Sequence, residues 1–264
     1  MRVDLISDIH IDFYIDDPTG DYRTKRYDKF IEEVLVPTGA EVLSIAGDIG
    51  HYNKQNRTLL TKLSNYYEHV FFTLGNHDFW LISSKQEKRY KFGFNRVAEL
   101  LSMDLPSNVH FVDNVINVDN FKVSGTIGFY DGSFMPDAEE WWKEQTYRKF
   151  SDYRRIPEAD SYRYLFDNYK YKGKLEKVDL MISHMNPSNK YEHQSPVWRD
   201  NSSTLFYCFD GTELRDSLDP KVWHFGHTHE KINYRIKGTE FICNPFGYPH
   251  ETGEGKGHIL QIEI

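Results

Sequence analysis

The stretch Glu41-Val42-Leu43-Ser44-Ile45-Ala46-Gly47-Asp48-Ile49-Gly50 predicts a buried β-strand that ends beside a carboxylate. The six residues from Val42 are apolar or small, a composition typical of a strand that is covered on both faces. A carboxylate just beyond such a strand lies at the rim of the sheet, where open α/β folds bind their ligands. Taken alone, however, the pair Gly47-Asp48 is more often an ordinary turn.

Four other strand-like runs end in the same way, and they change the interpretation of Asp48. These runs are residues 2–9, 70–74, 178–183 and 222–225. The side chains at their ends are Asp8 and His10, Asn76 and His77, His184, and His227 and His229. Single groups have structural alternatives, because Asp8 and His10 could form a buried hydrogen bond and Asn76 could cap a helix. Structural histidines would be scattered over the chain, so the joint pattern favours a shared metal site.

The donor types indicate which metals fit this site. Imidazole, carboxylate and amide donors without thiolate suit borderline divalent ions, with manganese as first choice and iron, zinc, nickel or cobalt as alternatives. Seven donors are too many for one tetrahedral ion, but they fit two ions that share a ligand. Asp48, on the central run, is the natural bridge between ions ~3.5–4 Å apart. The predicted metal ligands are Asp8, His10, Asp48, Asn76, His184, His227 and His229.

These groups resemble the five motifs of the calcineurin-like metallophosphoesterases, in the order in which that family carries them. The motifs here are Asp8-Ile9-His10, Gly47-Asp48, Gly75-Asn76-His77-Asp78, His184 and Gly226-His227-Thr228-His229. The later segment Asn244-Pro245-Phe246-Gly247-Tyr248 also resembles a turn common in bacterial and phage-type members. The resemblance runs from residue 8 to residue 229 and so covers nearly the whole chain.

The resemblance implies both a fold and a set of roles. The implied fold is α/β, a four-layer α/β/β/α sandwich of two mixed sheets flanked by helices, with the site at the strand ends. It assigns one metal ion to Asp8, His10, Asp48 and His229, and the other to Asp48, Asn76, His184 and His227. It makes His77 the general acid that protonates the leaving alkoxide.

One position departs from the family pattern. The family usually carries an Asp three residues after the bridging Asp, and this residue orients the catalytic His. Here that position is His51. The orienting role could fall to Asp78, to another acid or to no residue, and His51 could instead contact the substrate phosphate.

The predicted function is a dinuclear metal-dependent phosphoesterase that hydrolyses phosphomonoesters or phosphodiesters by in-line attack of a metal-bridging hydroxide. The substrate class stays open among nucleotides, phosphoproteins and small molecules. The net charge of -8 weakly disfavours long nucleic acid and anionic membranes. The alternative is a non-catalytic protein-interaction scaffold that keeps the fold. Such scaffolds typically lose metal ligands, whereas every ligand position is filled here.

Composition and length complete the expectations. The chain of 264 residues is expected to form a single domain over 1–264, with an aromatic-rich insertion at about 131–174 that packs its rings on the main body or walls the site. A helix is expected over 85–102. Cys208 and Cys243 form no spaced pattern, no apolar run approaches the ~20 residues of a membrane span, and the N-terminus leaves no room for a signal peptide. We therefore expect a cytoplasmic protein.

Overall fold

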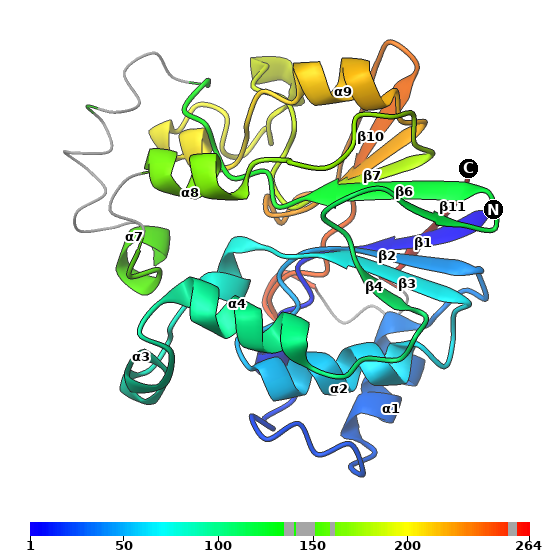
Figure 1. Cartoon of the computed structure of the whole chain (residues 1–264), viewed down its shortest axis with the longest axis vertical. Coiled ribbons are helices and arrows are strands. Elements are labelled where there is room, and N and C mark those ends of the chain that lie inside the picture. The colour runs from blue at the N-terminus through cyan, green and yellow to red at the C-terminus, as the bar shows by residue number, and fades with distance from the viewer. Residues whose placement is uncertain (135–139, 141–150, 159–161, 253–257) are drawn as a thin grey trace.

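Two β-sheets lie face to face with helices on their outer sides in the computed structural model, which describes residues 1–134, 140, 151–158, 162–252 and 258–264 (Figure 1). The five-stranded sheet has the order β11-β1-β2-β3-β4, and the six-stranded sheet has the order β5-β6-β7-β8-β10-β9. Strands β11, β5 and β9 run antiparallel to their neighbours and the other pairs are parallel, so both sheets are mixed. The predicted four-layer α/β/β/α arrangement is confirmed.

The strands are short and several follow one another with little intervening chain. Their bounds are β1 (Arg2–Ile6), β2 (Val42–Ala46), β3 (His69–Thr73), β4 (Val109–Phe111), β5 (Ile116–Val118), β6 (Phe121–Thr126), β7 (Leu180–Ser183), β8 (Val222–Phe225), β9 (Ile232–Ile236), β10 (Thr239–Cys243) and β11 (Leu260–Glu263). The α-helices are α1 (Arg26–Phe30), α2 (Asn53–Leu63), α3 (Ser84–Tyr90), α4 (Gly93–Ser102), α7 (Ser151–Arg155), α8 (Tyr162–Tyr169) and α9 (Thr212–Leu218). Other short helices are η1 (Ile11–Phe13), η2 (Ile31–Leu35), η3 (Asn76–Phe79), η5 (Tyr191–His193) and η6 (Ser202–Phe206).

Strand β2 is buried on both faces, as its sequence predicts. Val42 and Ala46 belong to an apolar cluster that draws residues from both sheets, whereas Leu43 and Ile45 belong to the larger cluster shared with the helices. This alternation follows from the two-residue period of a strand, which sends successive side chains to opposite faces. The strand is therefore held firmly on both sides, and so is the residue at its carboxyl end.

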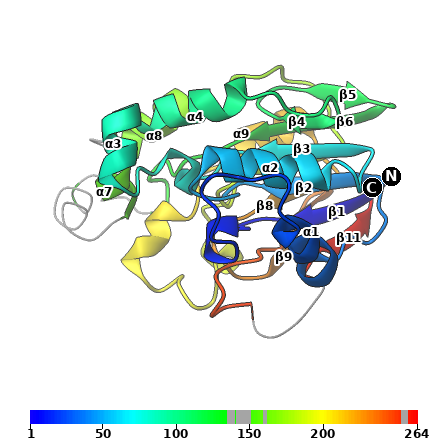
Figure 2. The same ribbon diagram turned by 90° about the horizontal axis from the view of Figure 1, so that it is seen from below.

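Helices α1 and α2 cover the outer face of the five-stranded sheet (Figure 2), while α9 lies on the outer side of the other sheet and α8 lies beyond the ends of its strands (Figure 1). The expected single helix over 85–102 is wrong, because the segment forms two helices, α3 and α4. The chain turns at Lys91, whose φ is 66°. The backbone N–H groups of Gly93 and Phe94 then donate to the carboxylate of Glu158 at 2.8 and 2.7 Å, which caps the start of α4.

The aromatic-rich insertion lies partly outside the described residues, namely at 135–139, 141–150 and 159–161. Its described part includes α7 and α8, in which Asp152 and Leu165 are buried. The ring of Tyr169 meets that of Phe79 with centroids 4.7 Å apart. These described residues of the insertion therefore pack on the main body.

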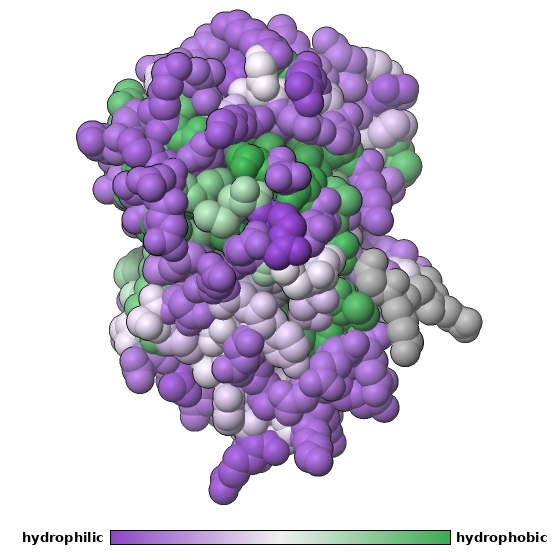
Figure 3. All heavy atoms as spheres, turned by 90° about the vertical axis from the view of Figure 1, so that its right-hand side faces the viewer, coloured by the Kyte–Doolittle hydropathy of each residue, from purple (hydrophilic) through white to green (hydrophobic). Residues whose placement is uncertain are grey.

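Figure 3 shows the side of the molecule where both termini lie, and hydrophilic side chains cover most of it, with hydrophobic ones gathered toward its middle. Strand β1 starts beside the N-terminus, so its carboxyl end, which leads to Asp8, points away from this side. None of the described helices combines the length and the apolar composition that a membrane span requires.

Candidate metal centre

The carboxyl ends of strands from both sheets meet at one place. The Asp48 carboxylate follows β2, and its Oδ2 lies 3.3 Å from His184 Nε2, which follows β7 of the other sheet. The same oxygen lies 3.9 Å from His10 Nε2, beyond the end of β1. His229, beyond β8, brings its Nε2 to 3.6 Å from Asp8 Oδ1. Asn76 and His77 follow β3, so five strand ends contribute side chains to a single site, because parallel strands end at a common edge.

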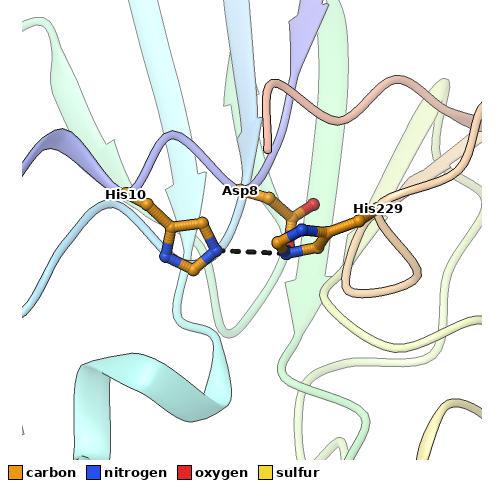
Figure 4. A group of neighbouring side chains, drawn as sticks. All are labelled: Asp8, His10 and His229. Carbon is orange, nitrogen blue, oxygen red and sulfur yellow. Dashed lines mark hydrogen bonds and ion pairs between the residues drawn. The ribbon is translucent and has the colours of Figure 1, made fainter. Parts of the chain in front are cut away.

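One group of donors consists of Asp8, His10 and His229, and Figure 4 shows them turned toward one another. The Nε2 atoms of the two imidazoles are 3.2 Å apart. A ligand atom from each of the three residues lies within 4.8 Å of the others. Such crowding of nitrogen and oxygen donors is the arrangement that a cation needs.

A second group of donors forms around Asp48. Ligand atoms of Asp48, His184 and His227 lie within 4.8 Å of one another. The amide oxygen of Asn76 lies 2.9 Å from His184 Nε2. His227 donates a hydrogen bond from Nε2 to the Phe206 carbonyl at 3.0 Å, which leaves the lone pair of Nδ1 available to bind a metal ion. The structure therefore brings all seven predicted residues into two neighbouring groups joined by Asp48.

His77 faces the same place. Its Nε2 is 3.9 Å from Asp48 Oδ2, and its backbone N–H donates to Asp48 Oδ1 at 2.9 Å. His10, Asp48 and His77 form a third set of ligand atoms within 4.8 Å of one another. Proximity alone therefore leaves His77 both within reach of a metal and within reach of a substrate bound there.

The backbone of the site is strained in a repeated way. Five of the seven candidate ligands have a left-handed conformation: φ is 53° at Asp8, 44° at His10, 53° at Asp48, 69° at His227 and 52° at His229. Asp and His tolerate this region better than most residues, but each instance still costs about 1 kcal/mol or more. Strain of this kind persists where the surrounding structure imposes it, and it concentrates at functional sites.

The glycines of the motifs make room for the carboxylates. A Cβ on Gly75 would overlap Asp48 Oδ1, and a Cβ on Gly226 would lie 2.8 Å from Asp8 Oδ2. Neither position can carry a side chain without displacing a donor. This close approach gives a physical reason for the glycine that precedes Asn76 and for the one that precedes His227.

The buried carboxylates of the site favour a bound cation. Asp8 and Asp48 are buried, and among the described residues no ion pair joins either of them to Lys or Arg. Burial raises the pKa of Asp8, whereas His184 and His77 outweigh burial at Asp48 and hold its pKa well below the usual range. Burial lowers the pKa of His184, but the Asp48 carboxylate outweighs it and raises that pKa to about 9. Two buried carboxylates among imidazoles fit divalent cations, both in charge and in donor type.

Two acidic residues outside the predicted set hold candidate ligands in place. Glu251 accepts a hydrogen bond from His229 Nδ1 at 2.7 Å, so the Nε2 of that ring faces Asp8. Asp152 of α7 accepts from the Asn76 amide at 2.8 Å, which turns the amide oxygen toward the site. Neighbours of this kind commonly orient metal ligands. No local sequence pattern points to either residue, because each reaches the site only through the fold.

The surroundings of His51 bear on the departure from the family pattern. His51 Nε2 lies 3.0 Å from His77 Nδ1, and His51 Nδ1 lies 2.7 Å from Asp12 Oδ2. Asp78, considered above for the orienting role, accepts a hydrogen bond from the backbone N–H of Gly75 at 2.8 Å instead. Asp78 therefore holds the turn, and Asp12 is the acid connected to His77.

A cleft of about 920 Å³ opens over the site. Its lining includes Asp48, Asn76, His77, His227 and His229, together with Trp80, Trp198, Tyr207 and Tyr248. Trp80 stacks on His77 with ring centroids 3.4 Å apart and planes at 25°, and its indole N–H donates to Asp152 at 2.6 Å. The cleft thus combines charged donors at its base with aromatic side walls, as small-molecule sites commonly do.

Comparisons with known proteins identify the family of this chain. An uncharacterized protein of Acanthamoeba polyphaga mimivirus is 22% identical over 270 residues, covering 93% of this chain and 91% of that protein. The phosphopantetheinyl hydrolase PptH from Mycobacterium tuberculosis has a similar fold, with a TM-score of 0.61 at 16% identity over 98% of this chain and 95% of that one. The family model for calcineurin-like phosphoesterases matches residues 1–231. Because that match spans most of the chain, the protein belongs to the calcineurin-like phosphoesterase family.

Proposed function

We propose that this chain is a hydrolase that uses two divalent metal ions to cleave phosphomonoesters or phosphodiesters. The observation that carries the proposal is the meeting of two carboxylates, four imidazoles and one amide oxygen at the ends of five strands. Family membership supports the same chemistry, because the family is one of phosphoesterases.

Each ion would have its own donors and would share Asp48 with the other. One ion would be held by Asp8, His10, Asp48 and His229, and the other by Asp48, Asn76, His184 and His227. The hydrogen bonds at His229 Nδ1 and His227 Nε2 support this division, because they leave the opposite nitrogen of each ring free. We propose manganese as the native metal, although iron, zinc, nickel and cobalt suit the same donors.

Two such ions, when bound, would neutralise the phosphoester oxygens and lower the pKa of a bound water toward ~7. His77 would then supply the proton to the leaving oxygen. Its Nδ1 is engaged by His51, and its Nε2 is directed toward Asp48 at the base of the cleft. Trp80 covers one face of the imidazole and keeps water from it. General acid catalysis of this kind contributes about 10²- to 10⁴-fold in rate.

The substrate is a phosphoester whose organic part fits the cleft, whether a nucleotide, a phosphorylated side chain or a small molecule. Long nucleic acid is disfavoured, because Lys231 is accompanied by Asp152, Glu230 and Glu251 in the lining and the whole chain carries -8. Ser151 and Asp152 lie in the lining as well. The insertion over 131–174 is therefore our candidate for the segment that selects the substrate.

The test is hydrolysis of p-nitrophenyl phosphate and its bis ester with added Mn²⁺, together with metal analysis of protein purified without chelator. We expect Asp48→Asn to abolish turnover and to reduce bound metal. Asp219→Asn is the matched control, because Asp219 is also left-handed, with φ of 43°, but is exposed and precedes the amino end of β8, whereas the candidate metal centre lies beyond the carboxyl end of that strand. Full turnover by Asp48→Asn with metal still bound would contradict the bridging role.

Two further outcomes separate the alternatives. Metal-loaded wild-type protein that hydrolyses neither ester across a broad screen would favour the scaffold over the enzyme. His77→Ala is expected to slow turnover, most strongly on esters with a basic leaving group, while metal content stays near that of the wild type. Loss of metal in this variant would instead make His77 a ligand.

A further inference from the structure

Three side chains from separate segments form a continuous hydrogen-bonded chain that ends at the metal centre. Asp12 lies in η1, His51 lies between β2 and α2, and His77 lies in η3. Asp12 Oδ2 is 2.7 Å from His51 Nδ1, and His51 Nε2 is 3.0 Å from His77 Nδ1. The other oxygen of Asp12 accepts from the His51 backbone N–H at 3.0 Å, so the carboxylate holds His51 at two points.

The direction of these hydrogen bonds follows from the chemistry of the groups. An ionised carboxylate only accepts, so Nδ1 of His51 donates to Asp12. Nε2 of a neutral His51 is then an acceptor, and Nδ1 of His77 donates to it. His77 is left with Nε2 directed to the metal centre, 3.9 Å from Asp48 Oδ2.

The chain is enclosed, which keeps it in one arrangement. The side chains of His51 and Asp12 are 4% and 10% exposed, so water does not compete effectively for their hydrogen bonds. The His51 ring stacks over Trp80, with centroids 5.7 Å apart and planes at 22°, and Trp80 also stacks on His77. Gln86 donates to the His51 carbonyl at 2.9 Å and fixes the backbone there.

The same contacts argue against a direct role for His51 in phosphate binding. Both of its ring nitrogens are already engaged, one by Asp12 and one by His77. A phosphate oxygen would have to displace one of these partners from a buried position. His51 therefore acts through His77 and does not contact the substrate.

We propose that Asp12 and His51 are positioning residues that hold the His77 imidazole with Nε2 toward the leaving oxygen of the phosphoester. This inference rests on the proposed function. In the step concerned, water releases one proton to solvent and its oxygen bonds to phosphorus, while the bond from phosphorus to the leaving oxygen breaks, its electron pair remaining on that oxygen. The proton on Nε2 of His77 passes to the leaving oxygen, while Nδ1 of His77 continues to donate to His51. His77 regains a proton from solvent before the next turnover.

The first test compares two esters that differ in how much they need an acid. The leaving group of phenyl phosphate is far more basic than that of p-nitrophenyl phosphate, so its departure depends more on protonation. For His51→Phe and Asp12→Asn we expect kcat on phenyl phosphate to fall about 10- to 100-fold, a part of the full general acid effect. We expect kcat on p-nitrophenyl phosphate to change by less than about 3-fold, with KM and bound metal unchanged. His110→Phe, an equivalent change on β4, should leave both rates at the wild-type level.

Equal losses on both esters, or no loss on either, would overturn the positioning role while leaving the phosphoesterase intact. If His77→Ala lowers kcat equally on both esters, the positioning role is overturned as well, because His77 would then not be the acid that Asp12 and His51 are proposed to position. Wild-type protein inactive on both esters would refute the proposed function itself, and with it this role. The three failures are therefore distinguishable.

The second test needs no variant and no turnover. Protein with ¹⁵N-labelled histidine and bound zinc, which has no unpaired electrons, allows the protonated nitrogen of each ring to be identified by NMR. We expect protons on Nδ1 of both His51 and His77, with Nε2 of His51 unprotonated. A neutral His51 protonated on Nε2 would reverse the hydrogen bonds and overturn the proposal.

Discussion

Replacement of Glu251 by Gln tests how strongly a residue outside the ligand set controls metal binding. Glu251 Oε2 accepts from His229 Nδ1 at 2.7 Å and also from the backbone N–H of Tyr248 at 2.7 Å. Gln keeps an oxygen that can accept from the ring, so Glu251→Gln removes the charge and leaves the geometry. Glu251→Ala removes both.

The size of the effect follows from the position of the carboxylate. Loss of such a partner typically weakens metal binding 10- to 100-fold, or about 1.4–2.7 kcal/mol. The Glu251 side chain is 33% exposed, so solvent screens part of its charge. We therefore expect about a 10-fold rise in the dissociation constant of one metal ion for Glu251→Gln. We expect a rise nearer 100-fold for Glu251→Ala, in which the His229 ring is also free to turn.

Calorimetric titration of metal-free protein with Mn²⁺ measures both constants. Glu230→Gln is the matched control, because Glu230 lines the same cleft but contacts Thr228 through its backbone. The affinity of the second ion, away from His229, should change little. Unchanged affinity in both Glu251 variants would refute the reasoning, and an equal loss in Glu230→Gln would show that only the overall charge of the cleft matters.

Two further predictions address the backbone and the core. Gly75→Ala should lose most bound metal and activity, because its Cβ would overlap Asp48 Oδ1. Gly238→Ala should lose neither, because no atom lies within 4 Å of the added Cβ. Normal metal content in Gly75→Ala would contradict the steric argument. Burial lowers the pKa of His224 to about 3, so between pH 6.5 and about 3 the unfolded chain binds a proton on this side chain that the folded chain does not. The free energy of unfolding therefore decreases by about 1.4 kcal/mol for each unit by which the pH is lowered in this range. In His224→Asn, Oδ1 can replace the ring nitrogen that lies 2.8 Å from the Ser44 hydroxyl. Between pH 6.5 and 5, the free energy of unfolding of this variant, measured in urea, should rise by about 2 kcal/mol relative to that of the wild type. Parallel plots of unfolding free energy against pH for the two proteins would disprove a buried neutral imidazole.

The parts of the site that could be predicted are those encoded by neighbouring residues. The run ending at Asp48 carries both its burial pattern and its donor within ten residues, so strand and candidate ligand are visible together. The same holds for the motif around Asn76 and for the pair His227 and His229. Their roles as ligands stay a prediction that metal analysis will decide.

The parts that could not be predicted depend on contacts between distant segments. Glu251 and Asp152 follow no motif, and each reaches a candidate ligand only once the chain has folded. His51 stood at a recognisable position, but its orientation depends on Asp12, 39 residues away. The break between α3 and α4 could not be predicted for the same reason, because Glu158, which caps α4, lies 65 and 64 residues beyond Gly93 and Phe94 in the sequence.

The left-handed backbone at five candidate ligands has a consequence for engineering. Glycine is free of the steric penalty at Asp8, His10, Asp48, His227 and His229. The combined strain is roughly 5 kcal/mol or more, similar to the whole folding stability of many domains. Selection of variants for heat resistance alone would thus favour glycine at these positions. Such a library would yield sturdier molecules from which the metal centre had been removed, unless catalysis were screened in every round.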